Sequence, residues 1–291
     1  MPMQKDQIFK KLEQIRNLPT LPSILEKLGA AVRDPNSDAS RIARIIADDP
    51  SMMARILKVV NSSLYGGLEP ITSLQLAVAR MGMNAINNIA LSTSVFSTFS
   101  KAQQAEFNRE EFWRHCISAG IAVNVLYDKC KPNLMHRYEK DVLHLAGLLH
   151  DIGKIIFETY FRAEFLASVQ ASRERHVPLF QVELELIGAD HAQVGAWLGA
   201  RWKLADDIIE TVRWHHEPDN ADDSRKELVM LCHGANYICN LVKLGDSGDA
   251  VAPAFFRGVW KRLGMETDDL SGVIERIEEE AKHSEVLLAF A

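Results

Sequence analysis

Histidine and aspartate side chains recur in this sequence at positions where they could hold a divalent metal ion. His150 and Asp151 are adjacent at the end of the apolar stretch VLHLAGLLHD, and His215 and His216 end the stretch ADDIIETVRWHH. Imidazole nitrogens with a carboxylate form a ligand set typical of iron, manganese, zinc or nickel ions. The carboxylate offsets part of the charge of the ion, and neutral imidazole tolerates apolar surroundings. These residue types therefore predict a metal centre.

Two further histidines fall on the apolar faces of expected helices. His115 lies in FWRHCISAGIAVNVL, in line with small residues one and two turns later. His191 follows Asp190, a candidate N-cap for which Gln193 would be the reciprocal partner of a capping box. Any single one of these histidines could be a core residue with its hydrogen bonds satisfied. Because four expected helices each bring a histidine on an apolar face, we favour a shared site.

Two neighbours of the His150–Asp151 pair bear on the same site. Gly147 precedes Asp151 by about one helical turn, so we expect it to leave space above that carboxylate. Lys154 follows His150 by one turn on the same face. It could contact a substrate phosphate as a point charge, or it could be a solvated lysine favoured by the helix dipole.

The elements that must position these residues are expected to be helices. Apolar residues recur at three- and four-residue spacing, and sustained alternation of the kind seen in strands is hard to find, which predicts an all-α fold. One periodic series comprises Ile42, Ile45, Ile46, Met53, Ile56, Leu57 and Val60. We expect a helical portion over 1–105 and a second over 106–291, with the boundary in the polar segment 97–111. Segments 128–139, 217–226 and 245–254 are expected to be surface loops, and the last helix to span about 268–288.

Composition limits the class of protein. The chain has 291 residues, 47% hydrophobic and 25% charged, which is typical of a soluble globular protein and excludes a mainly disordered, collagen-like or disulfide-scaffold chain. No apolar run is long enough for a transmembrane helix, and the start is too polar for a signal peptide. Four cysteines without CxxC pairing are expected to be buried or incidental thiols, namely Cys116, Cys130, Cys232 and Cys239. We therefore expect a cytoplasmic protein that does not bind membranes.

The charge distribution argues against a nucleic-acid partner. The formal net charge is −6, whereas bulk nucleic-acid binding needs many lysines and arginines for phosphate contacts. Residues 1–60 are an exception, with ten basic and seven acidic residues. Their expected helices have helix–turn–helix spacing and carry Arg41, Arg44, Arg55 and Lys58. A packing or partner surface is the favoured interpretation, and nucleic-acid binding through these helices is a minor alternative.

The order of these motifs resembles a known superfamily. The series His115, His150-Asp151-x-Gly153-Lys154, His191 and His215-His216-Glu217 resembles the HD superfamily of metal-dependent phosphohydrolases, and it is closest to the HD-GYP branch. The surrounding segments LPTLP (18–22), NSSLYG (61–66), FWRH (112–115), AGLLHDIGK (146–154) and HAQVG (191–195) resemble the HDOD domain. The resemblance covers about residues 10–290. It implies one all-helical HDOD unit with an HD-like C-terminal portion, and a role in bacterial signal transduction or regulation.

The resemblance also implies particular ligands. One metal would be held by Asp151, His191, His215 and His216. A second would be held by His115, His150, Asp151 and a late aspartate, at whose expected place this sequence has Asn236. Two ions sharing one carboxylate and a hydroxide leave a charge of about +2, which is costly to bury, whereas one ion leaves about +1. We therefore predict one bound metal (iron, manganese, zinc or nickel) and a weak or empty second position.

Two principal functions fit this sequence. The first is a regulatory module that binds a signalling protein partner or a nucleotide, in the groove between its two helical portions, with the metal holding the C-terminal helices in register. The second is a metal-dependent phosphohydrolase, a phosphodiesterase or phosphatase, in which the metal activates water and Lys154 steadies a phosphate. Asn236 and the lack of a Gly-Tyr-Pro segment after Glu217 favour the first function, and we assign no catalytic residue.

Overall fold

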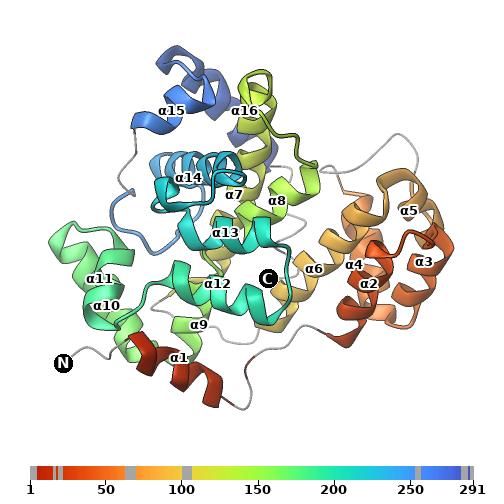
Figure 1. The fold of residues 1–291 in the computed structure, drawn as a ribbon, viewed down its shortest axis with the longest axis horizontal. Helices are drawn as coiled ribbons and strands as arrows, with labels where there is room; N and C mark the ends of the chain where they lie inside the picture. Colours follow the sequence, from red (N-terminus) through yellow and green to blue (C-terminus); the bar gives the residue numbers. More distant parts are fainter. Residues whose placement is uncertain are drawn as a thin grey trace. The chain divides into compact units, whose positions relative to one another are not determined.

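The computed structural model describes residues 5–15, 18, 22–62, 70–99, 107–252, 257–282 and 288 (Figure 1). All the regular elements in these ranges are helices, which confirms the predicted all-α class. No helix in the same ranges has the length and hydropathy needed to cross a membrane. The helices group into two compact units, one formed by residues 1–18 and 103–279 and the other by residues 19–102 and 280–291. Each unit is considered by itself.

In the described residues, the smaller unit contains five complete helices. They are α2 (Ser23–Arg33), α3 (Ala39–Ala47), α4 (Pro50–Val60), α5 (Leu74–Met81) and α6 (Met83–Phe99). Ile42, Ile46, Ile56 and Val60 of the predicted periodic series are fully buried in this unit, as helical spacing requires. The predicted boundary at 105 lies outside the described residues, as do residues 19–21 of LPTLP and 63–66 of NSSLYG.

The larger unit is built around α7, which is mostly buried and packs against α8 and α14. Two other close pairs are α9 with α12 and α12 with α13. Its helices are α1 (Lys5–Gln14), α7 (Arg109–Cys130), α8 (Lys140–Leu149), α9 (Ile152–Tyr160), α10 (Arg162–Arg175), α11 (Leu179–Leu186), α12 (His191–Arg201), α13 (Asp206–Trp214), α14 (Lys226–Leu241), α15 (Arg257–Leu263) and α16 (Leu270–Lys282), with short 3₁₀ turns at Lys131–Asn133, Pro218–Asn220 and Thr267–Asp269.

Side-chain caps fix where several helices begin. A side-chain oxygen just before the helix accepts a backbone N–H of the first turn, which would otherwise have no partner. Asp190 caps α12 in this way by accepting the N–H of Gln193 at 2.7 Å, as predicted. The Gln193 side chain bonds the Asp190 carboxylate rather than its backbone, so the reciprocal half of the box takes a different form. The other such caps are Asp38, Asp49, Ser73 and Asn108.

The glycine before the His150–Asp151 pair does not leave open space, contrary to the sequence-based expectation. A Cβ built on Gly147 would lie 2.7 Å from the backbone nitrogen and Cα of Gly120, and 2.7 Å from the carbonyl oxygen of Ala119. Backbone from α7 therefore fills that space. Small residues on α7 and α8 allow the two helices to cross closely, and this brings His115 toward Asp151.

Some predicted boundaries are also corrected. α7 continues to Cys130 and a 3₁₀ turn follows, so the expected loop over 128–139 is irregular only from residue 134. The last helix ends at Lys282, and residues 283–287 lie outside the described ranges. All four cysteines are buried thiols, as expected.

Candidate metal centre

The site is centred on a break between two helices. α8 ends at Leu149, His150 is its C-cap, and Asp151 is the residue before α9. Both side chains are fully buried. The Nδ1 atom of His150 lies 2.6 Å from the carbonyl oxygen of Gly147, which leaves the Nε2 atom facing the carboxylate of Asp151.

One oxygen of Asp151 faces the histidines of α12 and α13. Its Oδ1 lies 3.1 Å from Nε2 of His191 and 3.5 Å from Nε2 of His215. The Nε2 atom of His216 lies 2.8 Å from that of His191. These four residues form a buried group whose ligand atoms lie within 4.8 Å of one another, which is compact enough to hold a metal ion.

The other oxygen of Asp151 faces α7 and the end of α8. Its Oδ2 lies 3.9 Å from Nε2 of His115 and 3.3 Å from Nε2 of His150. These three residues form a second buried group of metal-ligand type. The structure thus places all six residues predicted from the sequence around one carboxylate, and we refer to them together as the cage.

Unsatisfied polar atoms show that the cage fits a cation. Nε2 of His115, His150 and His215 and Oδ1 of Asp151 are buried and have no hydrogen-bond partner among the described residues. Such atoms are costly to bury unless something else is bound to them. The Nδ1 atom of His215 lies 2.8 Å from the carbonyl oxygen of Val212. Donation from Nδ1 leaves the Nε2 lone pair free for a metal, which is the usual orientation of a metal-binding histidine.

Glu183 on α11 orients His191, and the sequence analysis missed it. Its Oε2 lies 2.5 Å from Nδ1 of His191 and accepts the backbone N–H of the same residue at 2.9 Å. The carboxyl group is fully buried although it belongs to a charged residue. A signal was present in the sequence, because Glu183 shares the apolar face of its helix with Leu179 and Val182. Glu183 therefore orients a candidate ligand, and it belongs to neither group of metal-ligand type.

Replacing Glu183 with glutamine is expected to weaken metal binding by about 10- to 100-fold, the usual effect of losing a carboxylate that orients a histidine ligand. The amide keeps the shape of the side chain and removes the charge that favours a basic Nε2. A competition titration with a fluorescent metal chelator measures the change. Glu185→Gln, at an exposed residue of the same helix that pairs with Arg175, should leave the affinity unaltered. An unchanged affinity in Glu183→Gln would contradict the role of this residue.

Lys154 is a second charged residue beside the cage, after Glu183. It is fully buried, so the alternative of a solvated lysine is wrong. Its ammonium group donates to Oδ2 of Asp151 at 2.8 Å, to Oδ2 of Asp249 at 2.7 Å and to the carbonyl oxygen of Ser247 at 3.1 Å. Lysine has three N–H donors, so all of them have acceptors. The expected contact with a substrate phosphate would require one of these bonds to break.

The segment that brings Asp249 to Lys154 is not a simple surface loop, which corrects the expectation for 245–254. Ser247 is buried, and the side chain of Asp249 is fully covered. Gly245 makes this path possible because its positive φ of 79° suits glycine, and a Cβ there would overlap the backbone nitrogen of His115. The backbone N–H of Asp246 donates to the carbonyl oxygen of Glu111, which fastens the segment to α7.

Asn236, at the expected place of a late aspartate, joins this network indirectly. Its Oδ1 accepts a hydrogen bond from the side chain of Asn240 at 2.6 Å. The hydroxyl of Ser247 lies 2.7 Å from Oδ1 of Asn240 and 2.9 Å from Oδ2 of Asp249. The carboxylate that reaches the cage from this region is therefore Asp249, through its contact with Lys154.

Burial and the two neighbouring carboxylates set the protonation of the cage. Burial lowers the pKa of His115 to about 3 and that of His215 to about 4, so both are neutral imidazoles at neutral pH. Burial also opposes protonation of His191, but Glu183 and Asp151 outweigh it and raise the pKa of His191 to about 10. Burial would raise the pKa of Asp151, yet His150 and Lys154 hold it well below its usual range. Asp151 is thus ionised and His115 and His215 are neutral, as a metal ion requires, whereas His191 carries a proton that an ion bound at its Nε2 would displace.

Comparison with known protein families decides where this chain belongs. The family model of the HDOD domain matches residues 18–218, more than half of the chain. The chain is a member of the HDOD family. The match confirms the resemblance indicated by the motifs around the cage histidines.

Related proteins agree with this assignment. An uncharacterized protein of Treponema pallidum (strain Nichols) is 25% identical over 224 residues, which are 77% of this HDOD chain and 42% of that relative. An HDOD domain protein from Geobacter sulfurreducens has the same fold, with a TM-score of 0.74 and 24% identity over 97% of this chain and 95% of its own. A Shewanella amazonensis SB2B protein provisionally named a phosphohydrolase has a TM-score of 0.70 and 20% identity, covering 96% and 97%. At these identities the solved structures show the fold alone.

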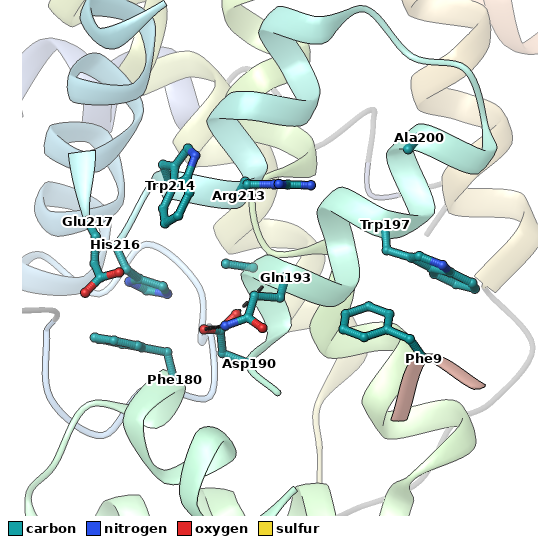
Figure 2. A pocket seen from close by; sticks show the side chains of 11 residues that line it. Phe9, Phe180, Asp190, Gln193, Trp197, Ala200, Arg213, Trp214, His216 and Glu217 are labelled. Carbon is teal, nitrogen blue, oxygen red and sulfur yellow. Dashed lines mark hydrogen bonds between the residues drawn. The ribbon is translucent and has the colours of Figure 1, made fainter. Parts of the chain in front are cut away.

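A pocket of about 420 Å³ lies next to the cage of this HDOD chain (Figure 2). His216 belongs to both, since it is one of the four metal-site residues and also lines the pocket. Its ring stacks on Phe180, with ring centroids 4.4 Å apart and planes 13° from parallel. Phe9 and Trp197 form a second aromatic pair along the wall, and Arg213 lies between the two pairs in the view. The pocket thus combines aromatic surfaces with a guanidinium group.

Proposed function

We propose that this HDOD chain is a regulatory module that acts by binding, and that one buried divalent ion holds the helices of its larger unit in register. The observation that carries this proposal is the burial of the four-residue group around Oδ1 of Asp151. His191 and His215 are fully buried with Asp151, and His216 is only 5% exposed. Four protein donors with almost no exposure to solvent are typical of a structural metal site, whereas catalytic sites keep an open position for water or substrate.

The buried charges in and around the cage favour a single ion. Asp151, Asp249 and Glu183 carry three negative charges and Lys154 one positive charge, so the formal charge is −2 when the histidines are neutral. One divalent ion makes the cage neutral, and a second would leave about +2 in a buried volume, at a large cost in free energy. The count from the sequence used Asp151 alone, so the structure strengthens the expectation of one metal.

The pocket beside His216 offers a place for the bound partner molecule. Its volume lies within the range of about 300–1,000 Å³ that is usual for small-molecule sites. Aromatic walls suit a planar ring, and Arg213 has no hydrogen bond or ion pair with the rest of the described chain. A guanidinium group binds phosphate through two parallel hydrogen bonds. These features favour a nucleotide over an apolar ligand.

The second candidate function is phosphohydrolysis, because the His/Asp cage is of the type that metal-dependent phosphohydrolases use. A bound metal would supply an activated water. In that case Asp151 and the histidines would hold the ion, and Lys154 would have to exchange one of its three acceptors for the phosphate. The complete set of bonds around Lys154 is the observation that places this function second.

Two measurements on the metal-loaded protein separate the candidates. We expect the rate of hydrolysis of p-nitrophenyl phosphate and bis(p-nitrophenyl) phosphate to be no higher than that of Asp151→Asn. We also expect adenosine monophosphate to quench the tryptophan fluorescence, because Trp197 and Trp214 line the pocket. Arg213→Ala should weaken the quenching about tenfold or more, and Arg44→Ala, at an exposed arginine of the smaller unit, should not. Hydrolysis that disappears in Asp151→Asn would establish the enzyme instead.

A further inference from the structure

The two oxygens of the Asp151 carboxylate face different kinds of positive charge. Oδ1 points to the four-residue metal group, whereas Oδ2 lies 2.8 Å from the ammonium nitrogen of Lys154. His115 and His150 flank the same Oδ2 atom at 3.9 Å and 3.3 Å. Lys154 is therefore located on the side of the carboxylate where a second cation would be bound.

The surroundings of Lys154 are those of a permanently bound cation. Three oxygen atoms, one each from Asp151, Asp249 and Ser247, lie within 3.1 Å of its nitrogen. Two buried carboxylates in direct contact with the ammonium group favour its charged form. A second metal ion at this position would face direct repulsion from the ammonium group.

We propose that the ammonium group of Lys154, held in place by Asp249, is a built-in substitute for a second metal ion on the Oδ2 side of Asp151. Removing its charge then converts the one-metal cage into a two-metal cage. The ligands of the new ion are His115, His150, Asp151 and Asp249. This inference rests on the proposed single-metal cage but not on the absence of hydrolysis, so it can fail independently of the proposed regulatory function.

Lys154→Met tests the inference, because methionine has a similar unbranched side chain and no charge. The formal charge of the buried groups in and around the cage falls from −2 to −3, and the three oxygens that accepted from the ammonium group lose that donor. We expect elemental analysis of protein equilibrated with excess Co²⁺ and then desalted to give two ions per chain instead of one. Lys154→Met/Asp249→Asn should return to one ion, because the fourth ligand of the new site is missing.

Lys261→Met removes a positive charge from an exposed lysine and should remain at one ion per chain, which controls for net charge. One ion per chain in a folded Lys154→Met variant would overturn the inference. A second measurement needs no variant: a Co²⁺ titration of the wild-type protein, followed by absorption, should saturate at one equivalent. Saturation at two equivalents, with Lys154 in place, would equally overturn the inference.

Discussion

Asp151→Asn is expected to abolish metal binding and to lower the melting temperature of the protein by about 10 °C or more. Asp151 supplies a donor to both halves of the cage, and its carboxylate also lies against Lys154. Breaking a buried charge pair by removing one partner costs about 3–5 kcal/mol. In a unit of this size each kcal/mol shifts the melting temperature by about 2–4 °C.

Metal addition supplies the second part of this prediction. An ion that binds only the folded protein stabilises it by about 4 kcal/mol when its concentration is about 1,000 times the dissociation constant. Zn²⁺ added after chelation should therefore raise the melting temperature of the wild-type protein by about 10 °C and have no effect on Asp151→Asn. Calorimetry with elemental analysis checks both points, and Asp268→Asn, at an exposed aspartate, serves as the matched control. Equal metal content in the wild-type protein and Asp151→Asn would show that Asp151 is not a ligand.

The second large effect is expected from Gly153→Ala, although the change adds only one methyl group. A Cβ at Gly153 would overlap the carbonyl oxygen of His191 and lie 2.8 Å from the backbone nitrogen of Gly195. Both obstacles are backbone atoms of α12, so no side-chain rotation can relieve the contact. Forcing a methyl group into a packed interface costs about 3 kcal/mol. α9 and α12 must then separate, and His191 moves away from Asp151.

We therefore expect Gly153→Ala to melt about 10 °C lower and to bind metal more weakly than the wild-type protein. Thermal unfolding followed by circular dichroism, with and without Zn²⁺, measures both effects. Gly199→Ala is a matched control on α12, because a Cβ there meets only side chains at ordinary contact distances of 3.4 Å and more. Because alanine has a higher helix propensity than glycine, Gly199→Ala should leave the free energy of unfolding equal or slightly increased. Equal stability of Gly153→Ala and wild type would refute the close approach.

The candidate ligands of the cage could be recognised from the sequence because they are of metal-binding residue types and recur at helical spacing. His115, His150 and His191 stand on apolar helix faces, where a polar ring needs a reason to be buried. The periodicity that placed them also predicted the helices correctly, as the buried positions of Ile42 and Ile56 illustrate. Local pattern and final structure agree wherever a helix buries one face.

The residues that support the ligands could not be identified in the same way. Asp249 lies in a stretch rich in glycine, serine and aspartate, where no periodicity indicates burial, and only tertiary packing brings it to Lys154. The prediction that Gly147 leaves open space is wrong, because a sequence does not reveal whether a small residue faces space or another backbone. Glu183 could have been noticed, since a glutamate on an apolar helix face requires a buried partner.

The contact between Lys154 and Asp249 also has a consequence for the order in which the chain folds. The two residues are separated by 95 positions in the sequence. Ribosomes add about 5–20 residues per second, so Lys154 waits about 5–20 s during synthesis before its second carboxylate exists. Until then its ammonium group has Asp151 alone as a carboxylate partner, and closing so long a loop is slow. We therefore expect the cage to form late in folding, and a chain that stops short of residue 249 lacks one of the two carboxylates that balance the charge of Lys154.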